Sequence, residues 1–199
     1  MTKFLCISGH ARHGKDTSAE MFKQHLEQMG YRVIIAHYAD LLKYICKSFF
    51  GWNGEKDEFG RTMLQRVGTD QVRRLNPNYW VDFITGVVRM FSDTWDFVIV
   101  PDARFPNELY RIVDAGFPMT HIRVVRDGFE SDLTDEQKSH SSETALDSYE
   151  YDYLLHNNTF EQLNSDVRKL CEEIQILHGK TGQPPTYDVM LGDKEHESN

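Results

Sequence analysis

A glycine-rich stretch with one lysine lies near the start of the sequence, between a short apolar run and a helical pattern. Gly9 and Gly14 are separated by four residues and Lys15 follows directly, which is the spacing of a phosphate-binding loop. Glycines permit backbone conformations that a Cβ forbids, and they let phosphate oxygens approach the main chain. The loop N–H groups and the positive end of the next helix can then hold an anion. The stretch predicts a nucleotide phosphate site in which Lys15 reaches the β- and γ-phosphates.

Asp16 departs from the usual form of such a loop. A Ser or Thr that ligates Mg²⁺ normally occupies this position, and here Thr17 comes one residue later. The departure concerns the metal ligands rather than the phosphate site.

Two further carboxylates follow predicted strands. Asp102 comes just after the apolar run 97–100, where it can orient Mg²⁺ or a water of its shell. Arg104, two residues later, is a candidate for a bidentate phosphate contact. Asp40 lies where the second strand should end, and ligands of open parallel sheets bind at that carboxyl edge.

The elements that must position these residues alternate along the chain. Strands are expected at residues 4–7, 33–36 with a continuation towards 38–40, 97–100, 121–125 and 151–155. Helices are expected at residues 15–29, 41–50, 61–75, after 78, after 105 and around 163–177. The helix after residue 78 should bury Trp80, Phe83, Ile84, Val87, Val88 and Phe91. The β-loop-α-β beginning is typical of a parallel α/β sheet.

Basic side chains occur between and after the two halves of the phosphate site. The helix at 61–75 carries Arg61, Gln65, Arg66, Arg73 and Arg74, which are either ligand contacts or surface ion pairs. Lys43 and Lys47 have a solvated helix face as their alternative, and Trp80 is either core or a ligand contact. The polar stretch 127–143, with Lys138 and His140, is typical of a lid, with a plain disordered loop as the alternative.

Composition bounds the class of protein. The 199 residues are 40% hydrophobic and 27% charged, which favours one soluble globular domain. A net charge of −9 argues against a protein that coats nucleic acid or an anionic membrane. The cysteines Cys6, Cys46 and Cys171 lack metal-ligand spacing, which favours a reducing cytosol. No signal peptide and no apolar segment long enough to span a bilayer are expected.

Four motifs together resemble one family. They are Gly-x-x-x-x-Gly-Lys-Asp-Thr at 9–17, Tyr-Ala-Asp-Leu-Leu-Lys at 38–43, Arg-Thr-Met-Leu-Gln-Arg-Val-Gly-Thr-Asp at 61–70 and Asp-Ala-Arg-Phe-Pro-Asn-Glu at 102–108. The sequence from about residue 3 to 178 is similar to bacteriophage-type deoxynucleoside monophosphate kinases, within the P-loop nucleoside monophosphate kinase superfamily. The stretch 140–143 and Asn157 resemble the lid end and the base-proximal strand end of these kinases.

The resemblance implies a three-layer P-loop kinase fold with a five-stranded parallel sheet flanked by helices. It implies one domain at 1–180, with a helical NMP-binding insertion at about 41–94 and a lid at about 127–143, and a polar tail at 181–199. The activity it implies is ATP- and Mg²⁺-dependent phosphoryl transfer to a deoxynucleoside monophosphate (dNMP), in the cytoplasm or in a host cell. A small-molecule substrate is the expected partner, without a nucleic acid polymer or a membrane. A homodimer is compatible with the resemblance, although no stretch identifies an interface.

Residue roles are carried over by motif. The ATP phosphates are expected at Gly9, Ala11, Arg12, His13, Gly14, Lys15, Asp16 and Thr17, with Asn157 nearby. Catalysis is expected from Lys15, Asp102, Arg104 and Arg126, and Mg²⁺ ligation from Asp16 and Asp102, with the choice between Asp16 and Asp40 left open. The dNMP is expected to contact Asp40, Lys43, Arg61, Gln65, Arg73, Trp80, Arg104 and Lys138.

Two alternatives remain from the residues alone. One is a kinase of another phosphorylated metabolite, of the phosphomevalonate type, because Lys-Asp loops and His-x-Ser-Glu stretches occur there too. The other is a nucleotide-binding protein without transferase activity, which the unusual Asp16 motivates. Tyr79 and Trp80, near the expected acceptor site, favour an acceptor that carries a base.

Overall fold

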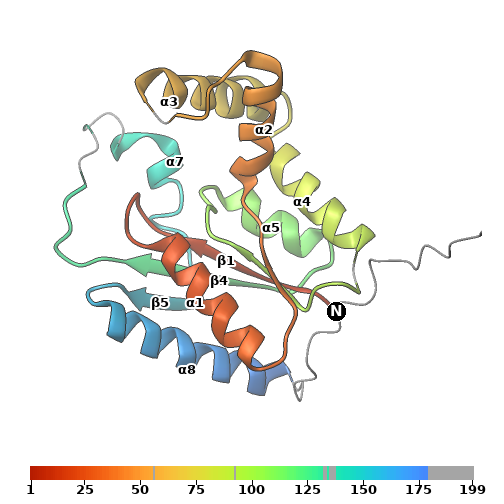
Figure 1. Cartoon of the computed structure of the whole chain (residues 1–199), viewed down its shortest axis with the longest axis vertical. Helices are drawn as coiled ribbons and strands as arrows, with labels where there is room; N and C mark the ends of the chain where they lie inside the picture. The colour runs from red at the N-terminus through yellow and green to blue at the C-terminus, as the bar shows by residue number, and fades with distance from the viewer. Residues whose placement is uncertain (56, 92, 132–133, 135–137, 179–199) are drawn as a thin grey trace, which may run out of the picture.

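The computed structural model describes residues 1–55, 57–91, 93–131, 134 and 138–178. Five strands form one sheet in the order β2-β3-β1-β4-β5, and every pairing is parallel (Figure 1). The strands are β1 (Lys3–Ser8), β2 (Val33–Ile35), β3 (Phe97–Val100), β4 (Met119–Val125) and β5 (Tyr153–His156). The five-stranded parallel sheet predicted from the sequence is confirmed.

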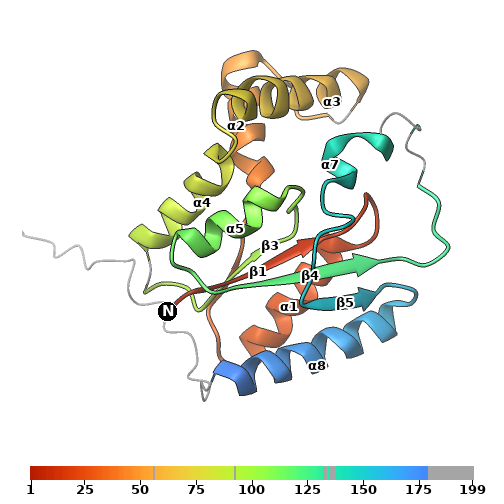
Figure 2. The same cartoon turned by 180° about the vertical axis from the view of Figure 1, so that it is seen from behind.

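Helices cover both faces of this sheet. They are α1 (Lys15–Gln28), α2 (Tyr38–Phe50), α3 (Glu58–Gln65), the π-helix η1 (Arg66–Arg73), α4 (Tyr79–Met90), α5 (Pro106–Asp114), α7 (Ser141–Thr144) and α8 (Phe160–His178). Helices α1 and α8 lie on one face, and α4 and α5 lie on the other (Figures 1 and 2). The result is the three-layer arrangement that the sequence predicts.

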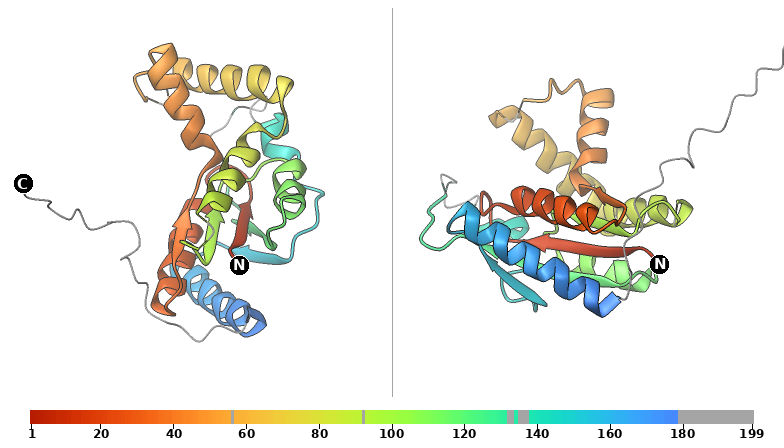
Figure 3. Two further views of the ribbon diagram at one scale, coloured as in Figure 1. Left: turned by 90° about the vertical axis from the view of Figure 1, so that its right-hand side faces the viewer. Right: turned by 60° about the horizontal axis from the view of Figure 1, so that its bottom comes forward.

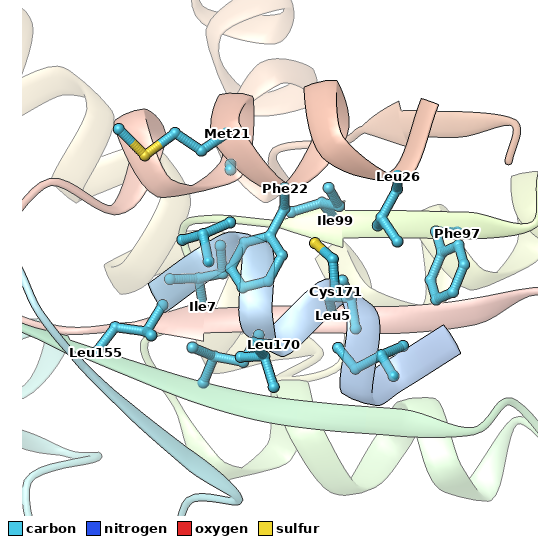
Figure 4. Close-up of a cluster of buried hydrophobic side chains, with 14 of the residues drawn as sticks. Leu5, Ile7, Met21, Phe22, Leu26, Phe97, Ile99, Leu155, Leu170 and Cys171 are labelled. Carbon is cyan, nitrogen blue, oxygen red and sulfur yellow. The ribbon is translucent and has the colours of Figure 1, made fainter. Parts of the chain in front are cut away.

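The central strand shows how the two layers are built. Side chains of successive strand residues point to opposite faces. Leu5 and Ile7 therefore pack into the layer of α1 and α8 (Figure 4), whereas Phe4 and Cys6 pack into the layer of α4 and α5. All four are at most 1% exposed, so β1 is fixed from both sides and can hold the glycine loop that follows it.

The expected extension of the second strand to residues 38–40 is wrong. Strand β2 ends at Ile35, and α2 begins at Tyr38. The carboxylate of Asp102 accepts hydrogen bonds from the backbone N–H groups of Tyr38 and Ala39, both at 3.0 Å. It thereby satisfies two of the unpaired N–H donors of the first helical turn. Because Asp102 lies 63 or 64 residues away in the sequence, the residues around Tyr38 alone do not predict that the helix begins there.

The helix expected at 61–75 is two elements. Helix α3 begins earlier, at Glu58, where the Asp57 side chain caps it by accepting from the N–H of Gly60 at 2.7 Å. From Arg66 the chain continues as a π-helix, a wider turn that is frequent at functional sites. Within it, the carbonyl of Gly68 accepts a bond from the buried Trp80 indole at 3.3 Å.

The buried face of α4 is rotated from the predicted one. Trp80, Val81, Thr85 and Val88 are the buried residues, while Phe83 and Phe91 are each 44% exposed. The apolar residues of this helix extend around more of its surface than its two neighbours can cover. Packing against α2 and α5 therefore decided the face, which the sequence periodicity did not resolve.

Helices α2 and α3 stand away from the sheet (Figure 3), while α4 packs on it. The bounds expected for the insertion (about 41–94) and the lid (about 127–143) remain predictions. Residues 132–133 and 135–137 of that lid, and the tail 181–199, lie outside the described residues. Within the described ranges, no helix is long and apolar enough to cross a membrane.

Candidate functional site

The phosphate loop connects β1 to α1 through a backbone that only a few residue types accept. Gly9 and Gly14 have φ values of 144° and 97°, and Arg12 also has a positive φ, at 64°. A Cβ at Gly9 would lie 2.3 Å from the carbonyl oxygen of Val124. The Nζ of Lys15 folds back along the loop and donates to the carbonyls of Gly9 at 2.7 Å and His10 at 2.9 Å. The loop therefore holds the ammonium group of Lys15 against its own backbone.

The ammonium group of Lys15 is held in an unfavourable environment. Its burial, together with the nearby positive charge of Arg104, lowers the pKa of Lys15 to about 8. The carboxylates of Glu143, Asp16 and Asp102 oppose this shift only in part. An added anion such as a phosphate would relieve the deficit of negative charge around this lysine.

A carboxylate already lies at the loop. Oε2 of Glu143, in α7, accepts a bond from the N–H of Ala11 at 2.9 Å, and Oε1 pairs with Nη1 of Arg104. The Glu143 side chain is 10% exposed, so this contact is largely shielded from solvent. Because a carboxylate presents negatively charged oxygens as a phosphate does, the contact shows that the loop and Arg104 can bind an anion. The sequence analysis did not predict Glu143 as a site residue.

Asp102 lies beside the loop, after β3. Burial raises its pKa, while the two N–H groups at the start of α2 act in the opposite direction. Since each carboxylate oxygen has more than one lone pair, both oxygens keep acceptor capacity beyond these bonds.

Asp16 and Asp40 belong to an outer chain of charges. His37 contacts Asp16 through Nε2 and Asp40 through Nδ1, both at 3.4 Å, and the Lys43 Nζ donates to Asp40 at 2.7 Å. The hydrogen bond with Asp16 is the main cause that raises the pKa of His37. Asp16 is 82% exposed in its side chain, and Asp40 and Lys43 do not line the cavity described next. In the described part of the chain, no three or more His, Cys, Asp or Glu side chains are grouped so as to hold a metal ion.

One cavity of about 1060 Å³ joins the phosphate loop to the inserted helices. Together with Asp102, it is lined by seven residues predicted for the nucleotide or the acceptor, namely Ala11, Arg12, Arg61, Gln65, Arg73, Trp80 and Arg104. Trp80 is 2% exposed and bonded to Gly68, so its core and cavity roles coexist. The cavity has basic groups near the loop and apolar walls from Leu42, Leu64 and Phe105.

Arg73 is oriented by a buried carboxylate that the sequence analysis missed as a site residue. Nη2 of Arg73 donates to Oε1 of Glu108 at 2.5 Å, and its guanidinium lies 4.6 Å above the Phe105 ring. Oε2 of Glu108 accepts from the backbone N–H groups of Arg104 at 2.6 Å and Phe105 at 3.0 Å. Glu108 is 1% exposed, and burial raises its pKa while Arg73 opposes the shift. The sequence does contain a feature that could have identified Glu108. It is the third residue of a helix that starts at Pro106, and a glutamate at this position can accept hydrogen bonds from the backbone N–H groups that precede the helix.

Other predicted residues lie around the loop rather than in the cavity. The Nδ2 of Asn157 donates to the carbonyl of His13 at 2.9 Å, which supports the loop from behind. The backbone N–H of Arg126 bonds to Nδ1 of His13 at 3.2 Å, while its guanidinium lies 4.7 Å above the Phe129 ring. Lys138 and Thr17 are exposed, and neither is among the cavity residues.

Helix α7 also touches the inserted helices. Nε2 of His140 lies 2.7 Å from Nε2 of Gln65 in α3, across the cavity mouth. Arg104 donates to the carbonyl of Ser142 at 3.1 Å. The short helix α7 thus contacts the phosphate loop, the loop after β3 and α3 at once.

Together the fold and this site define a P-loop phosphotransferase: a parallel sheet whose central strand ends in a glycine-lysine phosphate loop, with arginines around an adjoining cavity. The family model described as "Deoxynucleotide monophosphate kinase" matches residues 45–167. The chain therefore belongs to the deoxynucleotide monophosphate kinase family, and it is a kinase of the P-loop type. The matched range contains Arg73, Arg104 and Glu143 but begins after the phosphate loop, so the loop is identified by its own geometry.

Searches of other known proteins add little. The search of curated proteins found no match. Among solved structures, the Mycobacterium tuberculosis APS kinase CysC Cys556Ala mutant is 11% identical, with 87% of this chain and 98% of that chain covered and a TM-score of 0.49. Shikimate kinase from Bacteroides thetaiotaomicron is 11% identical over the same shares of the two chains, with a TM-score of 0.48. A de novo designed P-loop NTPase fold is 12% identical, covering 92% and 100%, with a TM-score of 0.43. At TM-scores below 0.5, these likenesses carry no argument about this chain.

Proposed function

We propose that the protein transfers the γ-phosphoryl group of ATP to the phosphate of a deoxynucleoside monophosphate, giving the diphosphate and ADP. The observation that carries the proposal is that a single cavity is lined by Ala11 and Arg12 of the phosphate loop and by the arginines Arg61, Arg73 and Arg104. A donor phosphate on the loop and an acceptor phosphate on the arginines would then face each other across this cavity. Membership of the family supports a nucleotide as the acceptor.

The chemistry asks the protein for positioning and charge neutralisation rather than for covalent intermediates. The bond between the γ-phosphorus and the oxygen bridging to the β-phosphate breaks, and a bond from an acceptor phosphate oxygen to that phosphorus forms. Lys15 neutralises charge on the donor, Arg73 orients the acceptor, and Arg104 lies between them. Apolar residues of the cavity wall and Ser142 and Glu143 of α7 would limit the access of water, which would otherwise compete as acceptor.

Residues at the sheet edge fit Mg²⁺ as a partner of the ATP phosphates. The carboxylate of Asp102 lines the cavity and keeps acceptor capacity, and Asp16 lies at the start of α1. Mg²⁺ in kinase sites is held by one or two carboxylates plus phosphate oxygens and water, so an all-protein cage is not required. When bound, the ion supplies neutralisation of phosphate charge, with Asp102 and Asp16 as the residues that would hold it.

The first test is a coupled ADP-release assay with ATP and Mg²⁺ across dTMP, dGMP, dCMP, dAMP and their ribonucleotide counterparts. We expect turnover that depends on at least one dNMP and falls about 100- to 1000-fold in Lys15→Ala, because a charged donor to the transferring group is lost. Lys23→Ala is the matched control, since Lys23 pairs with Glu27 on the outside of α1.

The acceptor panel separates the proposal from its rivals. ADP release that no nucleoside monophosphate stimulates would contradict the proposal, and other phosphorylated metabolites, of the phosphomevalonate type, would then be tried as acceptors. ATP binding without turnover on any acceptor would favour a nucleotide-binding protein without transferase activity.

A further inference from the structure

The carboxylate of Glu143 occupies a position that a phosphate oxygen should occupy in the working enzyme. It accepts the N–H of Ala11 at 2.9 Å and pairs with Arg104, so it is bound by one donor of the phosphate loop and one donor of the cavity wall. These two groups belong to opposite sides of the proposed transfer. We infer that Glu143 is an internal placeholder, which holds the position of the transferring phosphoryl group and must leave when the nucleotide phosphates enter. The inference rests on the proposed use of ATP.

Charge is the first argument. A bound triphosphate would bring several negative charges to the loop whose Ala11 N–H now serves the carboxylate. Two anions cannot share one donor set at contact distance without strong repulsion, which a shielded site screens poorly. The Glu143 side chain is 10% exposed, so screening by water is weak. Phosphate binding and the present position of Glu143 therefore exclude each other.

The second argument is how α7 is held. None of its residues, Ser141–Thr144, is buried, so this turn contributes no side chain to the core. The hydrogen bonds that join it to the rest of the protein are those of Ala11 and Arg104 to Glu143 and of Arg104 to the Ser142 carbonyl, and its N-cap residue His140 contacts Gln65. The buried anchor is Leu146, which is 3% exposed and packs under α7 in the core layer of α4 and α5. Polar contacts of this kind can be exchanged for contacts with a ligand without exposing apolar surface.

The third argument is the position of Arg104, the partner of Glu143. Arg104 is held at the site in the absence of phosphate, because Glu143 and the Ser142 carbonyl both accept from its Nη1. Its backbone stays fixed by Glu108, whose bond to the Arg104 N–H does not involve α7. When Glu143 leaves, the guanidinium of Arg104 is already placed for the phosphate. The arrangement keeps the arginine positioned at the cost of weaker phosphate binding.

The test compares binding of ATP and of inorganic tripolyphosphate by calorimetry in the wild-type chain and in Glu143→Gln. The amide keeps the shape of the side chain but removes the charge that competes with phosphate. If the placeholder contact is present in about 90% of free molecules, its loss lowers the apparent Kd about tenfold. The matched control is Glu161→Gln, an exposed residue of α8 that changes the net charge equally and should leave both Kd values unchanged.

Each outcome decides the inference. Tighter binding of both ligands to Glu143→Gln, with unchanged binding of adenosine, supports it. Equal or weaker tripolyphosphate binding overturns it and would mean that Glu143 stays in place and helps to hold the loaded state. A wild-type loop that binds neither ligand overturns both this inference and the proposed use of ATP, whereas normal binding that is insensitive to Glu143 overturns only the inference.

A second measurement needs only the wild-type chain, so it tests the inference even if Glu143→Gln does not fold. Tripolyphosphate should speed hydrogen exchange of the amides of α7 and of Ala145, because they lose the contacts that hold the turn to the loop. Unchanged or slower exchange there would also overturn the inference.

Discussion

The phosphate loop and the acceptor wall, by which we mean Arg61, Gln65, Arg73 and Arg104, are two halves of one cavity built in opposite ways. The loop is one contiguous stretch, and its lysine bonds carbonyls five and six residues earlier in the sequence. The acceptor wall is assembled from separate segments, and its fixing bonds span 35 residues between Arg73 and Glu108 and 39 between Arg104 and Glu143.

This difference indicates which substitutions should disrupt each half. The loop depends on local backbone geometry and on polar contacts that include the hydrogen bond from Asn157 to the His13 carbonyl. In the wall, one buried carboxylate, that of Glu108, fixes both the side chain of Arg73 and the backbone of Arg104. Variants of the supporting residues should therefore separate donor binding from acceptor binding.

The largest separation is expected from Glu108→Gln. Removing the charge leaves the half-buried Arg73 without its partner, so we expect the acceptor KM to rise about tenfold and the free energy of unfolding to fall by about 3 kcal/mol. The ATP KM should stay within about twofold, since the bonds of the phosphate loop do not involve Glu108. Steady-state kinetics with each substrate varied, and denaturant unfolding, measure these effects.

A double-mutant cycle shows whether the effect passes through Arg73. Arg73→Lys should raise the acceptor KM in the wild-type background but add little in Glu108→Gln. Asp82→Asn is the matched control, because Asp82 forms a 2.7 Å ion pair with Arg111 outside the cavity. Fully multiplicative effects of the two substitutions would show that Glu108 does not act through Arg73.

The converse separation is expected from Asn157→Ala. Loss of the hydrogen bond to the His13 carbonyl should raise the Kd for ATP about fivefold, the equivalent of about 1 kcal/mol, and leave the acceptor KM unchanged. Asn164→Ala, which removes a similar 2.9 Å bond to His25, is the control and should change neither value. An equal loss of donor and acceptor binding would mean that the two halves are not independent.

The smallest expected effect is a pH dependence of ATP affinity that arises from Lys15 in the phosphate loop. The pKa of Lys15 is about 8 without phosphate, and a bound phosphate raises it, so ATP binds best to the protonated form. Affinity is therefore fully present below pH 8 and declines above it, with the Kd rising about threefold between pH 7.5 and 8.5. Calorimetry across this range should give a flat profile for Lys15→Arg, whose charge does not titrate. A profile unchanged by that substitution would assign the titration to another group.

The elements that were predicted correctly share a property. The central strands β1 and β3 are short apolar runs buried from both faces, and the loop is defined by glycine positions that neighbouring residues make necessary. The errors occurred where a distant partner decides the local structure. Asp102 starts α2 at Tyr38, and packing on two neighbours selects the buried face of α4.

The sequence by itself determined the parallel sheet and the phosphate loop with Lys15, because these follow from local periodicity and contiguous spacing, and the resemblance of its motifs to a kinase family pointed to the basic residues. Only the tertiary structure decided which of the basic residues share a cavity, that Glu108 holds Arg73, and that Glu143 lies on the loop. Those contacts join residues dozens of positions apart, and their geometry depends on how the helices pack on the sheet. Linear spacing does not contain that information.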